Sequence, residues 1–266
     1  MIAQHWLWGS MSWPELAEAL DNNALAILPM GATEQHGPHL PLATDTIIAE
    51  GILSEALELL ESDTPILVLP TISVGHSPEH LSIAGTLSID ANKALNSWRQ
   101  IAESAFNAGL KRLVIFNAHG GQKALCDILA QQLRCEYEAR VITCHSDDLG
   151  LPPQLFRDGE ISHDEQRIGI HAGQIETSLM LVLAPTLVQM ALSENFSSSR
   201  EKLTGANEAL RSGGCARYAW LAEELNALGA VGNAAAANEA IGAKILEHRA
   251  AKLARVLEES IALPLV

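Results

Sequence analysis

The chain has 266 residues, of which 48% are hydrophobic and 18% charged, and this mixture excludes a disordered protein. Its length accommodates one large α/β domain, so we expect a single domain over residues 1–266. A formal net charge of −15 repels the phosphate backbone and therefore argues against nucleic acid as a partner.

Short apolar runs alternate along the chain with amphipathic stretches of helical length. Buried strands are predicted at residues 24–30, 65–70, 112–117 and 140–145, because these runs are continuous and partly β-branched. Helices are predicted at residues 46–61, 90–108, 122–137, 171–184 and 234–258, and residues 193–199 are the best loop candidate. Alternating strands and helices favour right-handed crossovers, so the predicted class is α/β with a mainly parallel sheet.

The cysteines and the apolar runs indicate in which cellular compartment the protein is expected. The four cysteines, Cys126, Cys135, Cys144 and Cys215, form no Cys-x-x-Cys pair, and scattered thiols are typical of a reducing compartment. The N-terminal segment lacks the pattern of a signal peptide, and no apolar run approaches membrane-spanning length. We therefore expect a cytoplasmic protein with no membrane partner.

Polar, histidine-rich segments directly follow three of the predicted strands. They occupy residues 34–36, 76–80 and 117–121. In open parallel sheets, ligands bind in the crevice beyond the carboxyl ends of the strands. We therefore expect these three segments to converge on one site.

The first candidate group is Glu34, His36 and Asp45. Glu34 and His36 are two residues apart, so in extended chain they point to the same side, and a proline-containing loop can fold Asp45 back toward them. Carboxylates and imidazoles together suit zinc, manganese or iron. The alternative is a polar turn in which Asp45 caps the next helix.

Two later segments carry further candidates. His119 ends a strand and precedes Gly120 and Gly121, which leave room for a substrate, although a tight turn with an incidental histidine is the alternative. His171 and Glu176 are poorly spaced to face each other on one helix, so His171 is expected before the helix and Glu176 one turn into it. The alternative for Glu176 is a favourable position in the first helical turn.

A serine hydrolase is a weaker interpretation. Ser77 has His80 nearby, but the chain has no Gly-x-Ser-x-Gly elbow. Ser77 is therefore kept as a candidate substrate-binding residue.

Four ordered motifs resemble those of the creatininase (creatinine amidohydrolase) family. Residues 31–45 (GATEQHGPHLPLATD) resemble its signature, which is the most specific of the four. The other motifs correspond to residues 75–80 (GHSPEH) with Gly85 and Thr86, residues 117–121 (NAHGG) and residues 171–178 (HAGQIETS). With a closing match at residues 229–232 and 237–239, the resemblance covers nearly the whole chain.

The resemblance implies a three-layer α/β/α sandwich and a site for two divalent metal ions, zinc or manganese, with iron as a further option. Glu34 and His119 would bind one ion, His36 would bind the other, and Asp45 would bridge them. His171 matches a histidine involved in proton transfer, so it is the predicted catalytic residue. Family members are often hexamers, so a homo-oligomer is expected.

The chain departs from creatininase proper beside the metal site. Gly120 and Gly121 stand where creatininase proper has Tyr-Glu, and that Glu is a metal ligand. We therefore predict that Glu176 is the replacement ligand and that Gly120 and Gly121 line a roomier substrate pocket.

A second departure bears on the substrate. Arg167 and Ile168 replace a Trp-Asp pair that creatininase proper has before its motif histidine, and Ala84 replaces a proline. Arg167 is predicted to favour an anionic substrate. These differences indicate a member other than creatininase proper.

The predicted function is hydrolysis of a C–N bond in a small amide, such as a cyclic amide or a formamide, by a hydroxide shared between the two ions. His171 would donate a proton to the leaving nitrogen. The alternatives are a metallopeptidase that acts on a short peptide and a non-catalytic, metal-bearing binding protein.

Overall fold

Four parallel strands form the centre of the computed structural model, which describes residues 2–21, 24–199, 202, 209–210, 215–216 and 218–265. The strands are β1 (Leu25–Met30), β2 (Ile66–Val68), β3 (Arg112–Asn117) and β4 (Arg140–His145), in the order β2-β1-β3-β4. All four were predicted. Only β2 is clearly shorter than expected, because Pro65 and Pro70 bracket it and have no N–H to donate.

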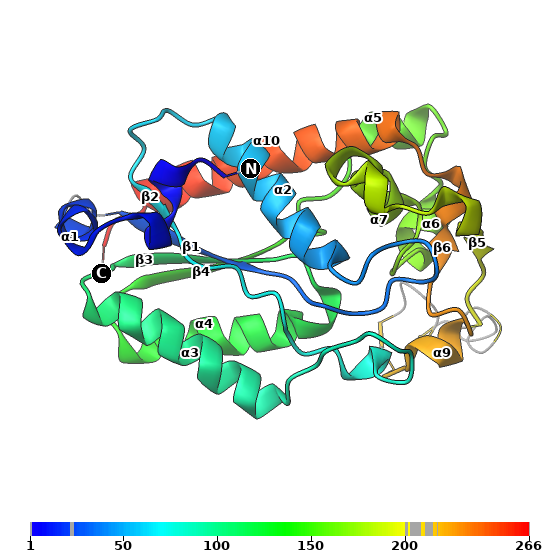
Figure 1. Ribbon diagram of the computed structural model, residues 1–266, viewed down its shortest axis with the longest axis horizontal. Coiled ribbons are helices and arrows are strands. Elements are labelled where there is room, and N and C mark those ends of the chain that lie inside the picture. Colours follow the sequence, from blue (N-terminus) through cyan, green and yellow to red (C-terminus); the bar gives the residue numbers. More distant parts are fainter. Residues whose placement is uncertain are drawn as a thin grey trace.

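Helices cover both faces of this sheet (Figure 1). On one face lie α3 (Ala91–Asn107) and α4 (Lys123–Glu136), and on the other lie α2 (Thr44–Glu58), α7 (Gln174–Leu183) and α10 (Glu239–Ala262). Alternate residues of β1 enter the two cores, with Ile27 on the α2 side and Leu28 on the α3 side. The expected three-layer α/β/α sandwich is therefore confirmed.

The remaining elements are short and lie at the ends of the layers. They are α1 (Trp13–Asp21), α5 (Pro153–Arg157), α6 (His163–Ile168), α9 (Ala222–Leu225), β5 (Asn195–Phe196), β6 (Gly232–Asn233) and the 3-10 turns η1 (Gln4–Trp6), η2 (Trp8–Ser10), η3 (Pro78–His80), η4 (Gly120–Gln122), η5 (Pro185–Leu187), η6 (Met190–Leu192) and η7 (Ala234–Ala236). Strand β5 pairs antiparallel with β6 and lies within the predicted loop at residues 193–199.

Two helices, α7 and α10, begin well after the predicted residue, and each has a local cause. Helix α7 begins at Gln174 because His171 is drawn into an antiparallel bridge with Val231. Helix α10 begins at Glu239, where the side chain of Asn238 accepts a hydrogen bond from the backbone N–H of Ile241 at 2.9 Å. Among the helices of the described residues, none is both long and apolar enough to span a membrane.

Helices α7 and α10 pack unusually close together near Gly242. A Cβ atom added at Gly242 would overlap the carbonyl group of Ser178 on α7. Glycine is therefore required at this crossing because the two backbones leave no space for a methyl group.

Candidate metal centre

The carboxyl ends of the strands open into a pocket of about 500 Å³, which we call the histidine–carboxylate pocket. Its polar lining includes Glu34, Asp45, Glu79, His80, His119, His171 and Glu176. The three polar segments predicted to converge therefore meet here, together with the start of α2 and the start of α7.

Asp45 lies between two histidines rather than capping a helix. Its Oδ1 is 3.2 Å from His36 Nε2, and its Oδ2 is 3.1 Å from His119 Nδ1. The N-cap of α2 is Ala43, so the capping alternative for Asp45 is wrong. Glu34 Oε1 lies 3.4 Å from the same His119 Nδ1, and both carboxylates are buried.

Backbone carbonyl groups fix which nitrogen of His36 and His119 carries the proton. His36 Nδ1 lies 3.1 Å from the carbonyl oxygen of Glu34, and His119 Nε2 lies 3.0 Å from that of His76. A carbonyl oxygen only accepts, so these nitrogens donate, and in the neutral ring the other nitrogen is bare. The bare nitrogens, His36 Nε2 and His119 Nδ1, are those that face Asp45.

This arrangement fits a bound cation. Ionised carboxylates and bare imidazole nitrogens only accept hydrogen bonds, so either a metal ion or a proton must lie between them. Glu34 Oε2, His36 Nε2 and Asp45 Oδ2 are buried and have no hydrogen-bond partner. Glu34, Asp45 and His119 each offer one ligand atom within 4.8 Å of the others, which is the donor chemistry that zinc and manganese accept.

The charges of the pocket hold protons where a metal ion would otherwise lie. Burial alone would lower the pKa of His36, but Asp45, Glu176 and Glu34 raise it to about 10. The pKa of His119 is likewise raised well above its ordinary value, against burial, chiefly by Glu34 and Asp45. Burial works to raise the pKa of Glu34, yet His119 holds it well below the ordinary value. The metal-free protein therefore retains protons on His36 and His119.

His171 and Glu176 approach the same pocket from the start of α7, as predicted. His171 precedes the helix and Glu176 lies in its first turn, where its carboxylate accepts the N–H of Ala172 at 2.5 Å. His36, His171 and Glu176 form a second group of donors within 4.8 Å of one another. Burial raises the pKa of Glu176 to about 7.

The side chain of Gln35 forms hydrogen bonds to several segments around this pocket, a role that was not predicted. Its Oε1 accepts the N–H of Gly37 at 3.0 Å, which fixes the amide orientation. Its Nε2 then donates to the carbonyl of Gly229 at 2.8 Å and to His80 Nδ1 at 2.7 Å. His80 Nε2 therefore carries the proton and points at Glu34 Oε1, 3.5 Å away. The only signal in the sequence was the position of Gln35 inside the first motif.

The backbone of Gln35 also orients His171. The carbonyl oxygen of Gln35 lies 2.7 Å from His171 Nε2, so this nitrogen donates its proton there. His171 Nδ1 is then the bare nitrogen, and it faces Glu34 Oε1 at 3.8 Å.

Asn117 is a further residue that sequence analysis did not single out. Its side chain donates to the carbonyl of His119 at 2.7 Å and accepts the N–H of His119 at 3.1 Å. Asn117 is the last residue of β3, so these two bonds attach His119 to the rigid sheet.

The predicted substrate-binding residues divide into two groups. Gly120 and Gly121 line the histidine–carboxylate pocket. Ser77 is fully buried, and its Oγ lies 3.2 Å from His119 Nε2. Because that nitrogen donates its proton to a backbone carbonyl, Ser77 lacks the general base that a serine nucleophile requires.

Arg167 lies apart from the pocket. It belongs to α6 and forms an ion pair with Asp164 at 2.9 Å. It is not among the residues that line the histidine–carboxylate pocket, so its predicted contact with substrate has no support in the geometry.

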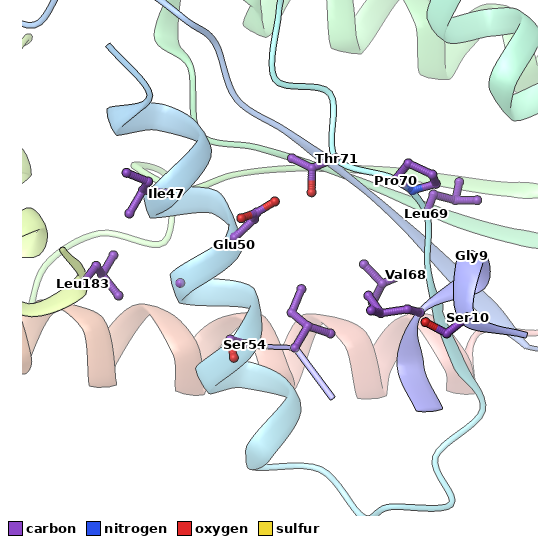
Figure 2. A pocket seen from close by; sticks show the side chains of 13 residues that line it. Gly9, Ser10, Ile47, Glu50, Ser54, Val68, Leu69, Pro70, Thr71 and Leu183 are labelled. Carbon is purple, nitrogen blue, oxygen red and sulfur yellow. The ribbon is translucent and has the colours of Figure 1, made fainter. Parts of the chain in front are cut away.

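A larger hollow of about 590 Å³, the α2 cleft, lies between α2, the end of β2 and the N-terminal turns (Figure 2). Figure 2 shows Ile47, Val68 and Leu183 around it, with Glu50 projecting from α2. Among the described residues that line it, Glu50 is the single charged one, and none is a histidine or a cysteine. The chemistry of a metal centre therefore belongs to the smaller pocket.

The fold and the site together define a three-layer α/β/α protein with a buried imidazole–carboxylate centre at the carboxyl end of its sheet. Residues 9–257 match the family model for creatininase, described as creatinine amidohydrolase. The chain therefore belongs to the creatininase family.

Two curated relatives and two solved structures are similar to the chain. It is 30% identical over 223 residues to the mycofactocin precursor peptide peptidase of Mycolicibacterium smegmatis, covering 83% of this chain and 79% of the relative. It is 27% identical over 198 residues to the creatinine amidohydrolase of Pseudomonas putida, covering 68% and 73%. Structures of a manganese creatininase (TM-score 0.78, covering 97% and 99%) and of a Zn–Zn type creatininase mutant (TM-score 0.77, covering 97% and 98%) share the fold at 23% identity.

Proposed function

We propose that the protein is a metal-dependent amidohydrolase that hydrolyses a C–N bond of a small amide, such as a cyclic amide or a formamide. The observation that carries the proposal is the convergence of imidazole nitrogens of His36 and His119 on the two carboxylate oxygens of Asp45, beside a pocket lined by Gly120 and Gly121. Family membership supports hydrolysis of a C–N bond.

The residues around Asp45 would hold two divalent ions, zinc or manganese, with iron as a further option. Glu34 and His119 would bind the first, His36 and Glu176 the second, and Asp45 would contact both with its two oxygens. When bound, such ions activate water as a nucleophile near neutral pH and polarise the carbonyl group that it attacks. Solved creatininases of manganese and zinc types support the choice of metals.

His171 is the proposed proton-transfer residue. Its Nε2 is held by the carbonyl of Gln35, which leaves Nδ1 facing the pocket interior beside Glu34. This nitrogen takes the proton that the attacking water loses and delivers it to the leaving nitrogen, which amine expulsion requires.

A His171→Ala variant tests this role directly. Turnover should fall by about 10²- to 10⁴-fold, the usual contribution of a general acid–base, while the metal content stays at the wild-type level. Exposed His5→Ala is the control and should change neither quantity. If metal content falls in parallel with turnover, His171 is a ligand and the assigned role is wrong.

A metallopeptidase is the second candidate. The M. smegmatis relative is named for a peptide substrate, and a Cβ atom added at Gly120 would meet nothing within 4 Å, so this side of the pocket is open to a peptide chain. Assays of cyclic amides, formamides and short peptides with added zinc or manganese separate the two candidates. Purified protein without any bound transition metal would contradict both, and bound metal without turnover would favour a binding protein.

Two further proposals concern the cellular location and the assembly of the protein. We propose a cytoplasmic protein, which is supported by four cysteines that are all free. We also propose a homo-oligomer, with a hexamer as the expected form, on family membership alone. Light scattering of the purified protein would measure the assembly, and a monomer would contradict it.

A further inference from the structure

A second cavity of about 340 Å³, the Arg249 cavity, adjoins the histidine–carboxylate pocket. The two hollows share Gly120, Asp147, Ile170 and Glu176 in their linings. A part of a ligand bound in the Arg249 cavity would therefore lie next to a part bound in the histidine–carboxylate pocket. The Arg249 cavity also has apolar walls, to which Ile48, Leu151 and Ile175 contribute.

Arg249 reaches this cavity from α10 and is 5% exposed. Its Nε donates to the carbonyl of Gly150 at 3.2 Å. Within the described part of the chain this is the only hydrogen bond of the guanidinium, and no carboxylate pairs with it. Burial lowers the pKa of Arg249, but a guanidinium keeps its charge in proteins.

The nearest acidic groups of the cavity have other partners. Asp147 is 2.7 Å from the Nζ of Lys123, and Glu176 accepts the N–H of Ala172. A buried and unpaired charge is costly, so Arg249 is best explained by a ligand that brings its own negative charge.

We propose that Arg249 binds a carboxylate of the substrate, so that the amide hydrolysed in the histidine–carboxylate pocket belongs to a molecule with a free carboxylate and a small apolar group. The guanidinium fork matches a carboxylate through two parallel hydrogen bonds, and the apolar walls accept the rest of the group. This inference rests on the proposed function and replaces Arg167, which lies on α6 paired with Asp164, as the anion-binding residue.

Calorimetric binding of 4-methylpentanoate and of its amide, 4-methylpentanamide, tests the proposal without requiring turnover. Metal-loaded wild-type protein should bind the carboxylate about 10- to 100-fold more tightly than the amide, the range of a charged hydrogen bond. Arg249→Met should lose this preference while its metal content is unchanged. Arg255→Met is the matched control on the same helix, because Arg255 is exposed and paired with Glu259.

Three outcomes would overturn the proposal. Equal binding of carboxylate and amide by the wild type contradicts it without any variant. An unchanged preference in Arg249→Met places the carboxylate on the metal ions or elsewhere, and loss of the preference in Arg167→Met alone assigns it to Arg167.

If Arg249→Met does not fold, Arg249→Lys keeps the charge but loses the fork, and its preference should fall below that of the wild type. Repeating the titration on metal-free protein separates this site from the metal centre, because carboxylate binding to Arg249 persists there even if the proposed hydrolysis fails.

Discussion

The carboxylate of Glu79 lies against the backbone of Gly121, in the space that a side chain at position 121 would need. A Cβ atom added there would overlap Glu79 Oε1 and would come within 2.8 Å of His119 Nε2. The family resemblance described above implies a glutamate at this position in creatininase proper. Here a carboxylate enters the same space from η3, a different segment of the chain.

Gly121→Ala should therefore disturb His119 and weaken metal binding. Substitutions that displace the partner of a ligand lower metal affinity by about 10- to 100-fold, and we expect a loss of this size. Gly120→Ala is the matched comparison, because a Cβ atom there meets nothing within 4 Å, and its metal affinity should stay near wild type. Competition with a chelator measures both, and equal affinities would contradict the expected crowding.

Metal uptake should release protons. The pKa of His36 is about 10 in the metal-free protein, so this imidazole is charged near pH 8 and must lose its proton before it binds a metal ion. Addition of Zn²⁺ to weakly buffered, metal-free protein should acidify the solution. His36→Gln should release fewer protons than the wild type, and the same release from both proteins would show that His36 is not a ligand.

His39 should make stability depend on pH in the acidic range. Burial, followed by the charge of His36, lowers the pKa of His39 to about 4, whereas the unfolded chain titrates near its ordinary value of 6.5. Between these values the unfolded state binds more protons, so the free energy of unfolding is greatest above about pH 6.5 and falls as the pH drops toward 4.

Urea denaturation of wild type and His39→Phe at about pH 5 and about pH 7.5 measures this contribution. The aromatic ring preserves the stacking of residue 39 on Phe196 but removes the titration. The difference in unfolding free energy between the two pH values should be smaller in the variant. An identical difference in both proteins would contradict the lowered pKa.

Gly242→Ala should destabilise the fold by about 1–3 kcal/mol, the usual cost of forcing extra atoms into a packed core. The obstacle is the Ser178 carbonyl, which belongs to the backbone and moves only if α7 moves. Gly9→Ala is the control, since a Cβ atom there meets nothing within 4 Å. Equal denaturation midpoints for the two variants would show that the helices separate more easily than their packing implies.

The sequence predicts the elements of this fold best where the local pattern is unambiguous. β3 and β4 begin and end at the predicted residues because their apolar, β-branched runs are continuous. The start of α7 was placed too early because the bridge from His171 to Val231 is a tertiary contact that no local pattern encodes. Glu34 was found because it follows the end of β1, and Asp45 because it lies in the same motif.

Arg249 and Glu79 were missed for different physical reasons. Glu79 matters through its contact with Gly121, and the two are brought together only by the fold. Arg249 did carry a signal, since it lies between Ile245 and Leu253 at four-residue spacing and so falls on the buried stripe of α10. A charged residue on an apolar stripe marks a buried ion, although its partner is not visible in the sequence.

The backbone crossing at Gly242 also constrains how the site can move. Because α7 and α10 interlock without an intervening side chain, they shift as one body, and Glu176 on the first helix keeps its separation from Arg249 on the second. A change in the shape of the two hollows would then come from the loops that complete their linings rather than from this helical pair. The two helices are thus the rigid part of the site, and the loops are the part whose conformation can change.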